Sequence, residues 1–202
     1  MSPPRRALIA ITSAHAPLYP EGKETGLFIT EALHPFNVFR KAGFEVDLVS
    51  ETGLYQPDWL SQQKEWLCDE DRAVWEDHSN ANGLQDIASE MYSAGAIIAA
   101  VCHGGAIFPG IIDSSTGKSI IANRKVTGFT TRGEEEEGVL GTIQSWSRPT
   151  IEASAALSGA TYVSPAGPWD AFTITDGRIV TGANPASAHV TAEASVKAFE
   201  SV

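Results

Sequence analysis

The stretch AIIAAVCHGGAI, residues 96–107, joins an apolar run directly to a cysteine, a histidine and two glycines. A short, fully apolar run of this kind is typical of a strand in a parallel sheet that is covered on both faces. The pattern predicts a strand over residues 96–102, then a tight turn permitted by the glycines, and a helix beginning over 106–112. Cys102 would therefore stand where the strand ends.

Strand and helix patterns alternate along the rest of the chain. Apolar runs and period-two alternation predict strands at residues 7–13, 45–50, 125–130, 160–164 and 178–182, with a hairpin arm at 172–175. Helical spacing predicts helices at 25–42, 83–94 and 193–199, while the polar interval 55–82 indicates helix and loop. This alternation predicts an α/β fold with a mainly parallel sheet. In such sheets the site lies beyond the carboxyl ends of the strands, where Cys102 is expected.

The composition is that of an ordinary globular protein. Of 202 residues, 43% are apolar and 19% are charged, which is enough for one domain with a substantial core. Aspartate and glutamate number 25 against 14 lysines and arginines, giving a formal net charge of −11. Without a basic patch, such a chain is poorly suited to bind nucleic acid or an anionic membrane. A small metabolite or a protein partner is expected instead.

The N-terminal residues MSPPRRALIAITSAHA have the basic pair and apolar run of a signal peptide. The run over residues 7–11 is too short, however, and Thr12 and Ser13 interrupt it, so a first strand is the better interpretation. Two cysteines are too few for a disulfide scaffold, which favours a reducing compartment. We therefore expect a cytoplasmic protein, and no segment is long enough to span a membrane.

Cys102 has two interpretations from the residues alone. At a corner between a strand and a helix, a thiol faces the positive end of the helix dipole, which favours the nucleophilic thiolate. Cysteine is also a common small hydrophobic residue of protein cores. The turn that follows it, with an adjacent histidine, favours the functional interpretation.

Three further groups are candidates to serve Cys102. His103 would act as its base, or would point away because neighbours on a strand face opposite sides. Glu31 lies in the predicted helix 25–42, where spacing alone favours an exposed or partly exposed position over a buried proton shuttle. The run GEEEEG, residues 133–138, is most often a solvated acidic loop, and the alternative is that one of its carboxylates orients His103.

The sequence carries no pattern for a metal or a nucleotide cofactor. The metal-ligand spacings HxxxH and CxxC are absent. The segment TSAHAPLYP follows the first predicted strand, in the place where a phosphate-binding glycine loop would stand. We expect neither kind of group.

Four separated blocks, in order, resemble the ThiJ/PfpI superfamily, and within it the fungal heat-shock, chaperone-like glutathione-independent glyoxalases. The blocks are TGLFITEALHPFNVFRKAGFEVDLVSETG (25–53), LQDIASEMYSAGAIIAAVCHGGAIF (84–108), VTGFTTRGEEE (126–136) and GPWDAFTITDGRIVTGANPASAH (167–189). The resemblance implies a flavodoxin-like, class I glutamine amidotransferase-like three-layer sandwich in a single domain, 1–202. It also implies a homodimer and conversion of methylglyoxal to lactate without a cofactor.

The same resemblance assigns roles to four residues. Cys102 matches the family's nucleophile at an elbow after a central strand, and His103 matches the adjacent histidine. Glu31, in the context EALHPF, matches a buried helix carboxyl, which replaces the exposed or partly exposed position favoured by spacing alone. Glu134, the first acid after TGFTTRG, matches the carboxylate that orients the histidine.

The chain departs from this family between residues 53 and 84. Relatives carry a longer insertion there, with a third strand that ends in a Gly- and His-containing loop beside the nucleophile. Here LYQPDWLSQQKEWLCDEDRAVWEDHSNANG fills the interval without an apolar strand, so the sheet is expected to lack one strand unless the interval restores it. An oxyanion donor lost with that loop would cost about two to three orders of magnitude in rate.

Three functions are consistent with these observations. The leading hypothesis is a cysteine-dependent glyoxalase III that acts on small reactive carbonyls. A second is a repurposed lyase, hydratase or cyclase of a specialised pathway, whose warrant is the remodelled interval. The third is a stress chaperone or redox sensor, in which Cys102 is oxidised reversibly and does not turn over a substrate.

Overall fold

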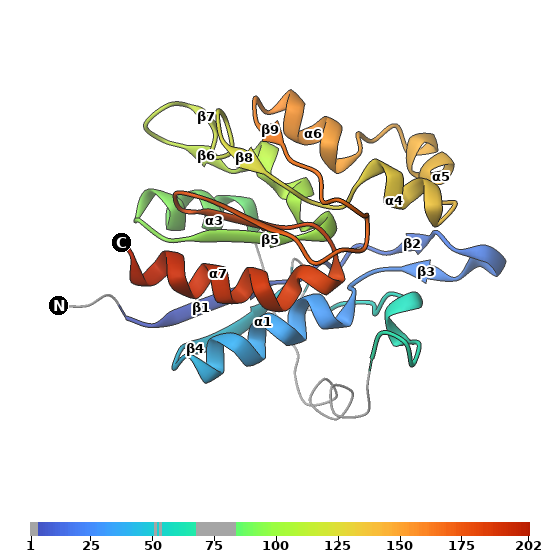
Figure 1. The fold of residues 1–202 in the computed structure, drawn as a ribbon, viewed down its shortest axis with the longest axis horizontal. Coiled ribbons are helices and arrows are strands. Elements are labelled where there is room, and N and C mark those ends of the chain that lie inside the picture. The colour runs from blue at the N-terminus through green and yellow to red at the C-terminus, as the bar shows by residue number, and fades with distance from the viewer. Residues whose placement is uncertain (1–3, 51, 53, 68–83) are drawn as a thin grey trace. The chain divides into compact units, whose positions relative to one another are not determined.

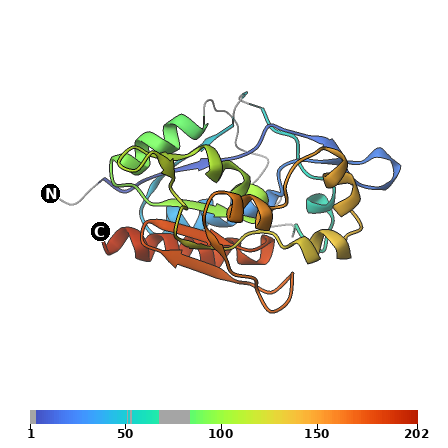
Figure 2. The same ribbon diagram turned by 90° about the horizontal axis from the view of Figure 1, so that it is seen from above.

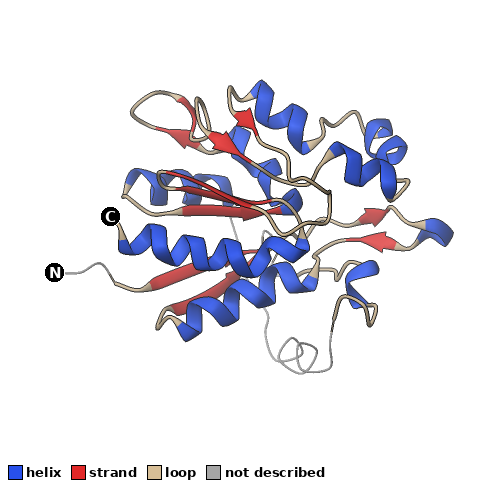
Figure 3. Cartoon of the chain, in the orientation of Figure 1, coloured by secondary structure: helices blue, strands red, loops and turns tan. Residues whose placement is uncertain are grey.

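The computed structural model describes residues 4–50, 52, 54–67 and 84–202. They form two compact units, Met1–Leu84 and Gln85–Val202, here called unit 1 and unit 2. Helices and strands alternate along the chain, as the two colours in Figure 3 show. Among the described helices, none combines the length and the apolar character that crossing a bilayer requires.

Unit 1 is a parallel strand pair with a crossover helix. β1 (Arg6–Ala10) pairs in parallel with β4 (Glu45–Val49), and α1 (Ile29–Lys41), which connects them, packs against both strands (Figure 1). The buried face of α1 has helical spacing and includes Ile29, Ala32, Leu33 and Phe36. All of these except Leu33 belong to a small core. Ile9, Leu27 and Leu67 belong to the same core.

Two boundaries predicted for unit 1 are wrong. The strand predicted at 7–13 ends at Ala10, and the helix predicted at 25–42 begins at Ile29. Thr25 pairs with Ala16 in a small hairpin of β2 (Ala16–Pro17) and β3 (Glu24–Thr25), joined through η1 (Pro20–Gly22). This pairing removes the first predicted helical residues from the helix.

The interval after β4 is described only in part. Residues 54–67 contain a short 3₁₀ helix, η2 (Leu60–Gln62), and one bridge between Leu27 and Pro57, with no strand. Residues 68–83, which complete the polar interval, lie outside the described residues. Over the described part, the expectation that this interval supplies no apolar strand is therefore confirmed.

Unit 2 is built on three paired strands. β5 (Ile98–Val101) pairs in parallel with β11 (Ile179–Gly182), which pairs antiparallel with β10 (Thr173–Asp176). α7 (Ala188–Glu200) packs against all three strands, and it lies alongside them in both views (Figures 1 and 2). The parallel pairs and the hairpin arm agree with the mainly parallel α/β sheet that the sequence predicts.

Shorter elements complete unit 2. α3 (Leu84–Ser93) leads into β5, and η3 (Cys102–Gly110) follows it. The others are β6 (Ile112–Asp113), β7 (Lys118–Ser119), β8 (Lys125–Val126), α4 (Thr131–Glu136), α5 (Leu140–Ser145), α6 (Ile151–Leu157), β9 (Thr161–Tyr162) and η4 (Pro185–Ser187). Side chains of α3, β5, η3, β8 and β11 form its main apolar core.

Five predictions for unit 2 need correction. The helix predicted at 106–112 is a 3₁₀ helix that begins at Cys102 itself and ends at Gly110. The strands predicted at 125–130 and 160–164 shorten to the two-residue strands β8 and β9, which pair in parallel. The solvated loop predicted at 133–138 is largely helix α4. The closing helix begins five residues before 193, because Asn184 and Ser187 form a capping box ahead of it.

Candidate active site

Cys102 lies at a sharp corner directly after β5. Val101 is extended (φ −123°), whereas Cys102 has φ 56°, in the left-handed region that residues with a Cβ rarely adopt. The carbonyl oxygen of Cys102 accepts a hydrogen bond from the N–H of Phe129 (3.3 Å), and only 5% of the residue is exposed. The backbone thus turns within one residue and is braced by the segment that follows β8.

Glycine is required where that segment meets the corner. A Cβ on Gly128 would lie 2.5 Å from Ile151 Cγ2 and 3.2 Å from the carbonyl oxygen of Cys102. Any side chain there would push the brace away from the corner or displace α6, which carries Ile151. Close packing against Ile151 and Cys102 therefore explains why the first glycine of VTGFTTRG, Gly128, is a glycine.

Three side chains of unit 2 form a continuous relay. Cys102 Sγ lies 3.3 Å from His103 Nδ1, and His103 Nε2 lies 2.7 Å from Glu134 Oε1. The Glu134 side chain is 4% exposed and the His103 side chain is 54% exposed, so the acid is buried behind an accessible imidazole. The structure brings together three of the four predicted site residues, and the interpretation of 133–138 as a wholly solvated run is wrong at Glu134.

The geometry indicates which ring nitrogen is the base. A carboxyl oxygen at 2.7 Å from Nε2 is placed to accept the Nε2–H hydrogen bond, which favours the tautomer with its lone pair on Nδ1. That lone pair faces Cys102 Sγ. His103 is therefore oriented to take a proton at or near the sulfur. The alternative, in which His103 points away from Cys102 as neighbours on a strand do, is wrong.

An aromatic row lies beside the relay. The rings of His103 and Phe129 have centroids 4.9 Å apart with planes tilted by 34°, and the rings of Phe129 and Trp169 have centroids 5.3 Å apart at 61°. Phe129 is 4% exposed. Nothing in the sequence marks either aromatic residue as part of the site, since single aromatic residues in loops give no periodic signal.

Glu31 belongs to unit 1. It lies in the first turn of α1, is half-buried, and has a buried Oε1 atom. This partial exposure agrees with the exposed or partly exposed position that spacing alone favours, whereas the place of Glu31 beside the thiol stays a prediction. Within the described residues, no group of three or more His, Cys, Asp or Glu side chains is arranged to hold a metal ion.

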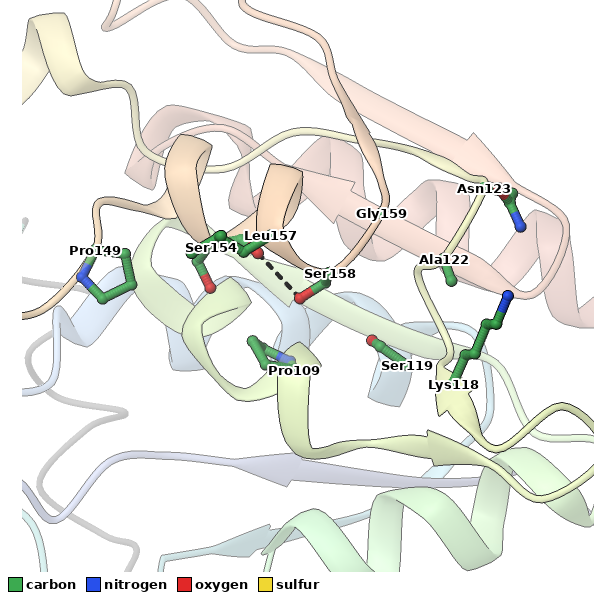
Figure 4. Close-up of a pocket in the computed structure, with 10 residues that line it drawn as sticks. All are labelled: Pro109, Lys118, Ser119, Ala122, Asn123, Pro149, Ser154, Leu157, Ser158 and Gly159. Carbon is green, nitrogen blue, oxygen red and sulfur yellow. Dashed lines mark hydrogen bonds between the residues drawn. The ribbon is translucent and has the colours of Figure 1, made fainter.

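A separate hollow of about 590 Å³ lies elsewhere in unit 2 and does not include the relay (Figure 4). Its lining combines apolar residues, among them Pro109, Pro149 and Leu157, with three serines, Lys118 and Asn123. Ser119 Oγ donates to the Phe108 carbonyl (2.7 Å) and Ser158 Oγ donates to the Ser154 carbonyl (3.0 Å), the latter drawn as the dashed line. These two hydroxyls are therefore bound to backbone carbonyl groups.

Proteins of known activity resemble the chain over almost its whole length. It is 42% identical, over 234 aligned residues, to a glutathione-independent glyoxalase of Saccharomyces cerevisiae, covering 98% of this chain and 99% of that protein. Its structure matches the crystal structure of glyoxalase III from Candida albicans with a TM-score of 0.92 at 40% identity, covering 98% of both chains. No protein-family model matches the sequence.

A more distant structure shares the fold alone. A ThiJ/PfpI domain protein from Brachyspira murdochii is 15% identical and has a TM-score of 0.57 over 98% of both chains. Together with the closer match, it confirms the α/β, flavodoxin-like fold class. The alignment with the yeast protein spans 234 positions whereas this chain has 202 residues, so at least 32 positions have no counterpart here. The relative is longer, as the resemblance implied.

Proposed function

The chain belongs to the glutathione-independent glyoxalases of the ThiJ/PfpI superfamily, and from that premise we propose that it converts small 2-oxoaldehydes such as methylglyoxal into 2-hydroxy acids, without glutathione or another cofactor. One observation carries the proposal: Cys102 Sγ, the His103 ring and Glu134 Oε1 are in line, with separations of 3.3 and 2.7 Å. This arrangement has a nucleophile, a base and an orienting acid, as covalent catalysis requires.

The first step is addition of the thiol to the aldehyde. Cys102 Sγ forms a bond to the aldehyde carbon C1, and the carbonyl π bond breaks. The thiol proton passes to Glu31 and from there to the oxygen on C1, giving a hemithioacetal. Backbone N–H groups at the corner, including that of His103, are the candidate donors to the oxygen while it carries negative charge.

The second step moves one proton between adjacent carbons. C1 is bonded to Sγ, and Nδ1 of His103 lies 3.3 Å from Sγ, so the base stands next to the C1–H bond. His103 takes that proton, the hydroxyl proton on the C1 oxygen passes to the C2 oxygen through an enediol, and His103 returns its proton to C2. C1 is oxidised to a thioester and C2 is reduced to an alcohol within one molecule, so no external oxidant or reductant is needed.

Hydrolysis completes the cycle. Water attacks the thioester carbon, the C–S bond breaks, and the 2-hydroxy acid leaves while Cys102 recovers its proton. Glu134 acts through His103, because it holds the imidazole in the tautomer that presents the Nδ1 lone pair. We assign Cys102, His103 and Glu31 as catalytic residues and Glu134 as a positioning residue.

Turnover of methylglyoxal by the purified protein tests the proposal. We expect lactate to form without added glutathione, and Cys102→Ser to abolish its formation. Cys68→Ser changes the chain's other cysteine and serves as the matched control, with activity close to that of the wild type. A folded wild-type protein that produces no lactate, or a Cys102→Ser variant that retains full activity, would contradict the proposal.

We also infer a homodimer and a cytoplasmic location. The homodimer is supported by the family resemblance. Size-exclusion chromatography with light scattering, which measures the molar mass of the eluting protein, tests it. The location is supported by the chemistry of a thiol nucleophile, which a reducing compartment keeps from forming disulfides. The repurposed biosynthetic enzyme and the chaperone without turnover are not favoured by relatives that are named as glyoxalases.

A further inference from the structure

The substituent on C2 of a 2-oxoaldehyde must lie close to the His103 ring. In the reaction proposed above, C1 is bonded to Cys102 Sγ and C2 receives a proton from the imidazole. Whatever C2 carries, a methyl group or something larger, therefore extends from the immediate surroundings of that ring. The side chains around the ring decide which substituents are accommodated.

Two aromatic residues occupy these surroundings in unit 2. Phe129 covers one face of the imidazole, with centroids 4.9 Å apart, and is itself almost fully buried. Trp169 contacts the edge of Phe129, with centroids 5.3 Å apart, and remains half-exposed. The Phe129 ring is buried, so the half-exposed indole of Trp169 extends the apolar surface from that ring towards solvent.

A buried amide fixes the loop that carries Trp169. Asn184 is 0% exposed, and its Nδ2 donates hydrogen bonds to the carbonyl oxygens of Pro168 (2.8 Å) and Asp170 (2.7 Å), the two neighbours of Trp169. Asn184 Oδ1 in turn accepts from the N–H and the hydroxyl of Ser187. The backbone is therefore held on both sides of Trp169, and the indole packs against the ring of Phe129.

We propose that Trp169 is a specificity-determining residue: its indole forms the wall against which the C2 substituent packs, so that the site selects 2-oxoaldehydes with a flat, apolar substituent such as phenyl over methylglyoxal. The inference rests on the proposed function and names its substrate class. An aryl group gains offset or edge-to-face contact with the indole, whereas a methyl group is too small to cover it. The buried acid Glu134 makes the same surroundings unfavourable for an anionic substituent.

The ratio of kcat/KM for phenylglyoxal to that for methylglyoxal tests the inference. We expect Trp169→Leu to lower this ratio by about tenfold, and Trp169→Phe, which keeps an aromatic wall, to lower it by about two- to threefold. Trp146→Leu is the matched control, since Trp146 is a 42% exposed tryptophan at the end of α5, and it should leave the ratio unchanged. An unchanged ratio in Trp169→Leu, or an equal fall for both substrates, would overturn the inference.

Alkylation of Cys102 separates this inference from the proposed function, because it needs no turnover. The rates with 2-bromoacetophenone and with bromoacetone are measured by mass spectrometry of the peptide that contains Cys102. If the wild type turns over neither aldehyde but Trp169→Leu still lowers the aryl-to-methyl alkylation ratio, the proposed function fails and the wall is supported. If methylglyoxal is turned over but neither ratio responds to Trp169, the wall is wrong and the proposed function stands.

Discussion

Cys102 is held in a backbone conformation that its own side chain disfavours. Its φ of 56° costs a residue with a Cβ about 1–2 kcal/mol, and glycine avoids that cost. We expect Cys102→Gly to be at least as stable as Cys102→Ala, although glycine in a strand or helix costs about 0.5–1 kcal/mol relative to alanine. Urea unfolding of the two variants measures the difference.

A second position supplies the reference for that comparison. Ala99 lies in β5, three residues before Cys102, with ordinary extended backbone. Ala99→Gly should therefore destabilise the protein, by about 0.5–1 kcal/mol. If glycine in place of alanine lowered the free energy of unfolding as much at position 102 as at position 99, the backbone at Cys102 would carry no strain.

Glu134 and Glu135 are neighbours with opposite environments. Glu134 is buried and lies 2.7 Å from His103 Nε2, whereas Glu135 is exposed. We expect Glu134→Gln to lower kcat for methylglyoxal about a hundredfold, because an amide can donate to Nε2 and so favour the wrong imidazole tautomer. The dependence of kcat on pH should change as well. Glu135→Gln should alter neither, and an equal effect of the two changes would assign the loss to overall charge.

At the scale of elements, Tyr162 of β9 holds the segment of Gly128 and Phe129, which contacts the backbone of Cys102. Its hydroxyl donates a 2.6 Å hydrogen bond to the carbonyl oxygen of Gly128, whose neighbour Phe129 donates to the Cys102 carbonyl. We expect Tyr162→Phe to destabilise the protein by about 1–2 kcal/mol, because the partly buried carbonyl loses its donor. Urea unfolding at neutral pH measures the loss.

The contribution of Tyr162 should also depend on pH. Burial raises the pKa of Tyr162 to about 12 from its ordinary value of 10. Since the folded state holds the proton more tightly than the unfolded state, the stabilisation is complete below pH 10 and is lost as the pH rises towards 12. The gap in unfolding free energy between wild type and Tyr162→Phe should narrow over that range. A gap that is constant up to pH 12 would contradict the assignment.

The local sequence pattern was sufficient to predict the strand that carries the nucleophile. It was insufficient where the burial of a residue depends on partners that are distant in the sequence. The apolar run before Cys102 predicted β5, whose four residues all pair in parallel with β11, although the strand is shorter at both ends than the predicted range 96–102. The run 133–138 was harder, since its charges suggest solvent, while Glu134 is buried by His103, 31 residues away in sequence. The resemblance identified Glu134 where local chemistry left the alternatives open, and neither identified Trp169.

At the scale of the whole molecule, length is the feature that separates this chain from its relatives. The alignment with the yeast glyoxalase contains at least 32 positions that this chain lacks. The composition of the interval after β4 gives no sign of an apolar strand, and its described residues 54–67 contain none. Composition does not reveal whether a chain that lacks these positions still unfolds in a single transition. That depends on how much apolar core each unit retains.

The described part of unit 1 has little structure of its own. Over those residues its main sheet has two strands, covered by one helix of 13 residues, and a sheet of that size is marginal in water. We therefore predict that residues 1–202 form one domain and that both units lose structure in a single transition. Pulse-labelling hydrogen exchange across a urea series, read on peptides from α1 and from α7, should give the same midpoint for both. A lower midpoint for α1 would mean that unit 1 unfolds independently, as a separate domain.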